Sequence, residues 1–119
     1  MRRVDRNEGV VTARPVATVY YRRNMRDWYP VPPPEVDASA YEKVAEVPVK
    51  DPLAFDVHTI LEALFQEFNL GEQNYQRKIR SMSTGDVVVF AEGDAWYCAS
   101  VGWVKVNFRA PTVYDFLAG

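Results

Sequence analysis

The chain has 119 residues, of which 48% are hydrophobic and 25% charged, and its formal net charge is −2. This composition excludes a disordered chain, and the length predicts a single domain. No apolar run approaches the roughly 20 residues that a membrane-spanning helix needs, and the first residues lack the apolar core of a secretory signal. Cys98 is the only cysteine, so an intrachain disulfide is excluded, and we expect a cytoplasmic protein.

Positive charge is concentrated at the start of the chain. Residues 1–28 contain seven arginines and three acidic residues, a local charge of +4, whereas the remainder carries −6. A basic arm on an acidic body is one way to bind nucleic-acid phosphates, but charged termini are often only solvated. Residues 1–15 show no periodicity, so we predict a flexible tail there and one domain over residues 16–119.

Two strands are predicted in the first half of this domain. Residues 16–21 are β-branched and aromatic, which favours a strand. Residues 41–49 alternate between apolar and charged side chains, and Pro48 suits the end of an edge strand. This alternation predicts that Tyr41 and Ala45 lie on the same side of the strand.

Between these strands lies a proline-rich segment, residues 28–34. Four prolines in residues 30–34 forbid a helix and favour an extended polyproline II conformation. Such a segment is either a ligand for an aromatic groove on a partner or a stiff connector. In the second case, Trp28 and Tyr29 are expected to pack back onto the core.

The clearest element is an amphipathic helix over about residues 57–69. Apolar side chains recur there at helical spacing: Val57, Ile60, Leu61, Leu64, Phe65 and Phe68. Asp56 is a suitable N-cap, and Gly71 is a suitable end, able to adopt the left-handed conformation.

Sheet patterns return after Gly85. Residues 86–90 and 95–101 flank a glycine-containing turn, which predicts a hairpin. Gly102 indicates a bulge or sharp bend before a further strand at residues 103–106, and residues 111–119 are expected to pack on the core. The fold class is therefore α+β: an antiparallel sheet of four to five strands with one main helix on one face.

No catalytic or metal site is evident in the sequence. One histidine and one cysteine are too few for a zinc site. Cys98 falls within an aromatic strand, where a free cysteine is usually a small buried apolar residue. His58 falls in the first helical turn, where the helix dipole disfavours its charged form. We therefore predict a non-enzymatic protein without catalytic residues, metal or cofactor.

Residues 80–90, with the sequence RSMSTGDVVVF, have two interpretations. Ser81, Ser83 and Asp86 can form a turn that leads into a strand, with Gly85 supplying a positive φ. Alternatively, the hydroxyl-rich turn forms a surface that binds a partner or an anion. The turn interpretation is complete without a ligand, and the binding interpretation stays open at this point.

Two further sets of residues are candidates for binding. Aromatic side chains dominate interface energies, so Trp28, Tyr29 and Trp103 are candidate anchors for a protein partner. Basic residues interleaved with tyrosines are candidates for nucleic-acid binding: Arg22, Arg23, Arg77, Lys78 and Arg80.

Four segments, in order and at similar spacing, resemble the YodL-like domain: YEKV from Tyr41, FQEFN from Phe65, RSMSTGDVVV from Arg80 and WYCASVGW from Trp96. The resemblance covers about residues 41–106. It implies a small protein of phages, plasmids or other bacterial mobile elements, with no established enzyme activity.

We therefore expect an accessory protein of phage or mobile-element type that binds a host protein in the bacterial cytoplasm. The alternative is a nucleic-acid-binding protein that uses the N-terminal arm and the Arg77–Arg80 cluster. A homodimer joined through an edge strand is compatible with either function.

Overall fold

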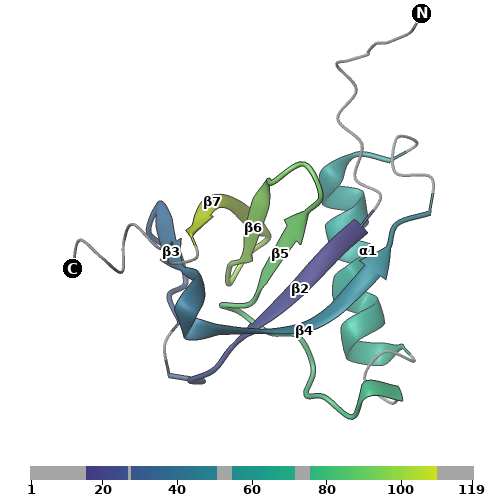
Figure 1. Ribbon diagram of the computed structural model, residues 1–119, viewed down its shortest axis with the longest axis horizontal. Helices are drawn as coiled ribbons and strands as arrows, with labels where there is room; N and C mark the ends of the chain where they lie inside the picture. The colour runs from purple at the N-terminus through teal and green to yellow at the C-terminus, as the bar shows by residue number, and fades with distance from the viewer. Residues whose placement is uncertain (1–15, 27, 51–54, 72–75, 110–119) are drawn as a thin grey trace, which may run out of the picture.

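The computed structural model describes residues 16–26, 28–50, 55–71 and 76–109 (Figure 1). Its elements, in chain order, are β2 (Val16–Arg22), β3 (Glu35–Asp37), the 3-10 helix η2 (Ala38–Ala40), β4 (Tyr41–Pro48), α1 (Val57–Leu70), β5 (Val87–Phe90), β6 (Ala95–Cys98) and β7 (Trp103–Arg109). The α+β class is confirmed. The predictions for residues 1–15 and 111–119 lie outside the described residues. Among the helices described, none is long and apolar enough to cross a membrane.

The described strands form one sheet in the order β3-β7-β6-β5-β2-β4. Neighbouring strands are antiparallel except β3 and β7, which are parallel. The predicted antiparallel sheet of four to five strands is therefore wrong in number and in one pairing. Strand β3 was missed because it has only three residues and directly follows the prolines. The N–H of Asn107 donates to the carbonyl of Pro34 at 2.8 Å and holds this junction against β7.

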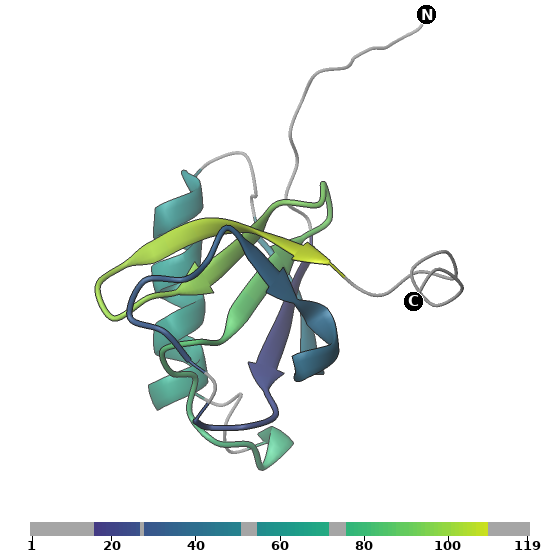
Figure 2. The ribbon, with the colours of Figure 1, turned by 90° about the vertical axis from the view of Figure 1, so that its left-hand side faces the viewer.

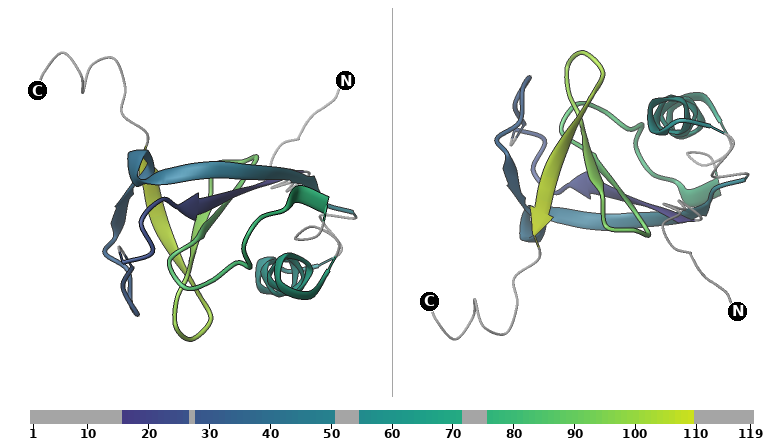
Figure 3. Two further views of the ribbon diagram at one scale, coloured as in Figure 1. Left: turned by 90° about the horizontal axis from the view of Figure 1, so that it is seen from below. Right: turned by 90° about the horizontal axis from the view of Figure 1, so that it is seen from above.

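The sheet is strongly curled. Strands β3 and β4 stand at opposite ends of the strand order, yet only the three residues of η2 separate them in sequence. The two ends of the sheet must therefore approach each other, as seen in Figures 1 and 3. Aromatic rings pack against each other inside the curl: the ring centroid of Phe108 lies 4.8 Å from that of Tyr20 and 5.2 Å from that of Tyr41.

The central strands β2 and β5 are covered on both faces of the sheet. Helix α1 covers the outer face (Figure 2), and its stripe is confirmed by the burial of Ile60, Leu61, Leu64 and Phe68. The inner face closes on itself because of the curl. Strand β5 contributes Val88 to the outer cluster and Val87 to the inner one. This explains why residues 87–90 form a continuous apolar run instead of alternating with polar residues.

The ends of α1 agree closely with the prediction. The carboxylate of Asp56 accepts a hydrogen bond from the N–H of Thr59 at 2.8 Å, which satisfies a free donor of the first turn. At the other end, the N–H of Gly71 donates to the carbonyl of Glu67 at 3.0 Å. Gly71 has a φ of −97°, so the predicted left-handed termination is wrong.

Strand β4 lies at one edge of the described sheet, as its sequence predicted. The prediction that Tyr41 and Ala45 lie on the same side of the strand is wrong, because the register shifts between Val19 and Tyr20 of β2 and leaves Val44 as an extra residue. The bulge turns Tyr41 towards the inner cluster and Ala45 towards the outer one. A bulge, exposed charges and a terminal proline all discourage pairing of an edge with another chain.

Gly102 forms part of a turn between two strands. The N–H of Ala99 donates to its carbonyl at 3.0 Å, and its φ is +74°. The predicted bend is therefore confirmed, and the bulge alternative is wrong. The preceding strand ends at Cys98, three residues earlier than predicted, because the chain reverses there into β7.

Candidate functional site

The carboxylate of Asp86 is the centre of a buried polar cluster. Its Oδ1 accepts from the backbone N–H of Arg22 at 3.1 Å and from Nη2 of Arg80 at 2.8 Å. Its Oδ2 accepts from Nη1 of Arg80 at 2.7 Å and from the N–H of Ser83 at 2.8 Å. A carboxylate offers about four lone-pair sites, so Asp86 has no acceptor capacity left for a ligand.

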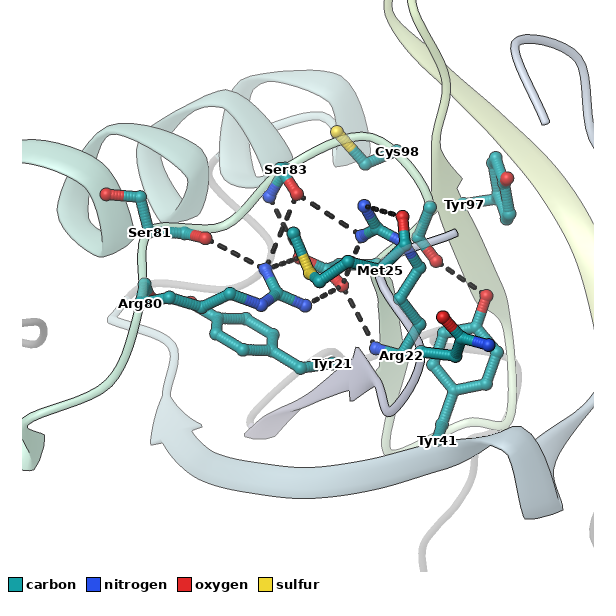
Figure 4. Close-up of polar contacts among 12 residues, drawn as sticks. Tyr21, Arg22, Met25, Tyr41, Arg80, Ser81, Ser83, Tyr97 and Cys98 are labelled. Carbon is teal, nitrogen blue, oxygen red and sulfur yellow. Dashed lines mark hydrogen bonds and ion pairs between the residues drawn. The ribbon is translucent and has the colours of Figure 1, made fainter. Parts of the chain in front are cut away.

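Arg80 is fixed by more than its ion pair. Figure 4 shows its guanidinium above the ring of Tyr21, with the guanidinium carbon 4.0 Å from the ring centroid. The Tyr21 hydroxyl donates to the carbonyl of Arg80 at 3.0 Å. Burial lowers the pKa of the Arg80 guanidinium, but the hydrogen bonds and charge of Asp86 outweigh this and raise it. The Arg80 guanidinium therefore stays charged.

Arg22 lies inside the same cluster and is almost fully buried. Its Nη1 lies 3.4 Å from Oδ1 of Asp86 and donates to the hydroxyl of Ser83 at 3.2 Å. Its Nη2 donates to the carbonyl of Met25 at 3.4 Å, and Figure 4 shows Arg22, Arg80 and Ser83 converging. The cluster thus ties the end of β2 to the turn before β5.

Gly85 allows the chain to pass this cluster. Its φ is +101°, and a Cβ added there would lie 2.9 Å from Cδ of Arg22 and 2.9 Å from Cβ of Trp28. Its carbonyl accepts from the hydroxyl of Tyr41 at 2.5 Å, and its N–H donates to the carbonyl of Cys98 at 2.8 Å. The turn between Ser81 and Asp86 therefore has the structural role that its composition predicts.

As candidate binding residues, the members of this turn differ. Asp86 is fully buried and both its carboxylate oxygens are already hydrogen-bonded, so its side chain does not reach the surface. Ser83 is half-buried and uses its hydroxyl on Arg22, while Ser81 is exposed and its carbonyl accepts from Arg80 at 2.9 Å. Only Ser81 therefore presents its side chain at the surface.

Cys98 and His58 lie in different environments. Burial, together with the nearby charges of Asp86 and Glu62, raises the pKa of the Cys98 thiol to about 12. A thiol with this pKa is a poor nucleophile at neutral pH. The ring of His58 instead contacts that of Trp96, with centroids 5.2 Å apart. Within the described residues, no group of histidine, cysteine and acidic side chains is arranged to hold a metal ion.

The candidate aromatic anchors separate into two kinds. Trp28 and Tyr29 are 42% and 58% exposed, so each covers part of its surface against the fold and leaves the rest open to solvent. Trp103 is only 7% exposed, and its indole N–H donates to Glu62 of α1 at 3.1 Å. Because its ring also packs against Phe65, Trp103 holds the helix on the sheet and is not an exposed anchor.

The backbone around the exposed aromatics is held in place. The hydroxyl of Tyr97 accepts from the N–H of Tyr29 at 2.7 Å and donates to its carbonyl at 2.9 Å. The N–H of Ser100 donates to the carbonyl of Pro30 at 3.2 Å. The segment of residues 28–34 therefore lies across the β6–β7 end of the sheet.

The candidate nucleic-acid residues are not brought together as one patch. Arg22 is buried, and Arg80 is ion-paired with Asp86. Both side chains therefore stabilise the turn before β5. Arg23, Arg77 and Lys78 are exposed. The sequence could not show this division, since it depends on Asp86, which lies 64 residues from Arg22 along the chain.

A pocket that the sequence analysis missed opens near Tyr29. It has a volume of about 380 Å³ and lies where β3 and the start of β4 meet the proline-rich segment. Three tyrosines contribute to its wall: Tyr29, Tyr41 and Tyr97. Their positions in sequence give no signal of a shared site, because the curl of the sheet brings them together.

Comparison of the chain with protein-family models found no match. Neither the curated proteins nor the solved structures gave a match.

Proposed function

We propose that this protein acts by binding a protein partner through an exposed apolar surface built around the proline-rich segment. We define this binding surface by the exposed side chains Met25, Trp28, Tyr29, Val31 and Val101. The observation that carries the proposal is that Trp28 and Tyr29 are 42% and 58% exposed although their neighbouring backbone is hydrogen-bonded to β6 and the turn after it.

Physical reasons support this choice. Exposed tryptophan and tyrosine are the side chains that contribute most to protein interfaces. A fixed backbone lowers the entropic cost of binding, because the partner does not have to order the chain that carries the aromatic side chains. Hydrogen bonds from Tyr97 and Ser100 provide that fixation. The resemblance to the YodL-like domain supports the further proposal that the partner is a bacterial host protein and the chain an accessory protein of a mobile element.

The test compares capture of bacterial proteins by the wild-type chain and by the double variant Trp28→Ala, Tyr29→Ala. Alanine keeps Cβ and the backbone hydrogen bonds, so the fold is expected to persist. Nuclease-treated lysate removes bridging nucleic acid. Leu70→Ala, at the exposed end of α1, is the matched control. We expect the wild type and Leu70→Ala to retain one specific protein that the double variant loses; equal retention by all three would contradict the proposal.

Binding of nucleic acid is the alternative function. Because Arg22 and Arg80 are engaged within the fold, it would rest on Arg23, Arg77 and Lys78 together with the N-terminal arm. It requires an affinity for DNA or RNA that falls steeply with salt. Titration with labelled single- and double-stranded oligonucleotides at low salt tests it, and no binding there would exclude it.

A further inference from the structure

Among the described residues, Met25 is the sulfur-containing residue that is open to solvent. It is 50% exposed and lies on the turn that follows β2. The other two such residues in the described part of the chain are buried: Met82 is 2% exposed and Cys98 is 5% exposed. Cys98 is further protected because its raised pKa keeps it a thiol, and the thiolate is the form that reacts with peroxides. A mild oxidant therefore reaches Met25 before either of the others.

The turn that carries Met25 is held by its backbone. The N–H of Arg23 donates to the carbonyl of Ala40 at 2.9 Å, and the carbonyl of Met25 accepts from Nη2 of Arg22 at 3.4 Å (Figure 4). Neither hydrogen bond uses the thioether of Met25. A chemical change confined to Sδ therefore leaves the turn and the Asp86 cluster in place, and alters only the surface that the turn presents.

Met25 also belongs to the binding surface defined above and precedes Trp28 by three positions. A thioether is apolar and adapts its shape to the apolar side chains of a partner. A sulfoxide is polar, and covering it without a hydrogen-bond donor is unfavourable. Oxidation of Met25 therefore replaces an apolar contact by a polar group that the partner would have to desolvate.

We propose that Met25 is a reversible oxidation site at which hydrogen peroxide switches the binding surface off. A lone pair of Sδ attacks one peroxide oxygen, the O–O bond breaks as the S–O bond forms, and the proton of the attacked oxygen passes to the departing oxygen. The peroxide thus leaves as water, and the thioether, oxidised by two electrons, becomes the sulfoxide. Methionine sulfoxide reductases reverse this change. The inference rests on the proposed function, since it concerns the regulation of the same surface.

Peptide mapping by mass spectrometry tests which methionine reacts. The full chain is exposed to hydrogen peroxide at neutral pH for increasing times, and sulfoxide formation is followed at each methionine. We expect Met25 to oxidise at least about tenfold faster than Met82 in the folded chain, and the two to react at similar rates in urea. Equal rates in the folded chain would overturn the proposal.

Capture from nuclease-treated lysate tests the consequence, with the peroxide removed before the lysate is added. We expect the oxidised wild type to retain at least about fivefold less of the captured protein, and treatment with methionine sulfoxide reductases A and B to restore capture. Met25→Leu is the matched control, because it keeps an apolar side chain of similar size without sulfur. Its capture should survive peroxide, and an equal loss in this variant would place the effect elsewhere and overturn the proposal.

Failure of this inference is distinguishable from failure of the proposed function. If the wild type captures a protein in a manner dependent on Trp28, and oxidation of Met25 leaves that capture unchanged, the switch fails alone. If the unoxidised wild type captures no protein, the proposed function fails and the switch fails with it, whatever the mapping shows. Urea unfolding of the oxidised chain serves as the check on folding, and we expect its midpoint to match that of the untreated chain.

Discussion

Asp86 shows how one side chain can organise distant parts of a small fold. Its carboxylate joins the turn before β5 to Arg22 at the end of β2 and to Arg80. The sequence predicted the local part of this arrangement, a turn in which Asp86 accepts from a nearby N–H, because a short polar side chain can close a turn in this way. In the fold this donor is the N–H of Ser83. The sequence could not supply the distant part, because no local pattern pairs Arg22 with a residue 64 positions later.

The Asp86 cluster predicts a large loss of stability on substitution. Asp86→Ala leaves Arg22 buried without its counter-charge, and breaking such a pair costs about 3–5 kcal/mol in the free energy of unfolding. Urea unfolding followed by tryptophan fluorescence measures it. The control is Asp94→Ala, which breaks the exposed pair with Lys105 and is expected to cost less than about 1 kcal/mol. Equal costs would show that the buried cluster does not stabilise the fold.

Cys98 predicts a dependence of stability on alkaline pH. Its thiol has a pKa of about 12 in the fold against an ordinary value of 9.0, because burial disfavours the thiolate. At a pH between these two pKa values, the thiol of the unfolded chain loses its proton and the thiol of the folded chain keeps it. The free energy of unfolding therefore falls as pH rises above about 9, by at most about 1.4 kcal/mol per pH unit for this group.

Burial also raises the pKa of the Tyr21 phenol, so Tyr21 contributes to the same alkaline loss. We expect Cys98→Ala to make the decline shallower without abolishing it, as measured by urea unfolding at a series of pH values. A decline of unchanged steepness in Cys98→Ala would show that the thiol is not the titrating group. Consistent with burial, native Cys98 should react with iodoacetamide near neutral pH far more slowly than the urea-unfolded chain.

At the scale of elements, predictability follows the range of the interactions. Helix α1 was predicted almost to the residue because its stripe and its cap lie within fifteen consecutive positions. Strand β3 was missed because its pairing with β7 is set by residues about seventy positions away. The bulge at Val44 likewise depends on how β4 pairs with β2, so the pattern of residues within β4 alone could not predict it. The pocket depends on all of these and was therefore not predicted.

The turn before β5 predicts contrasting effects of two glycine substitutions. Both Gly85 and Gly93 have positive φ angles, +101° and +105°. An added Cβ at Gly85 would clash with Arg22 and Trp28, whereas at Gly93 nothing lies within 4 Å. We expect Gly93→Ala to cost about 1–2 kcal/mol from backbone strain alone, and Gly85→Ala to cost clearly more. Thermal or urea unfolding of the two variants measures the difference, and equal losses would contradict the packing account.

For the whole molecule, the curled sheet predicts an order of local stability. Strands β2 and β5 lie in the interior of the strand order, with side chains buried on both faces. Strand β3 is a short edge. We expect the amides of Val19 and Val88 to exchange with solvent only by global unfolding, and those of β3 to exchange faster by local opening. Hydrogen–deuterium exchange resolved by residue tests this order, and equal protection throughout would refute it.

The pairing of β2 with β5 also bears on how the chain is made. A ribosome delivers β2 and β4 first, but the interior neighbour of β2 follows only after the intervening connector, helix and turn. Arg22 precedes Asp86 by 64 positions, which corresponds to about 3–13 s of synthesis at about 5–20 residues per second. During that interval the nascent chain carries apolar strand surface without its cover, so translation speed and chaperone access become determinants of its yield.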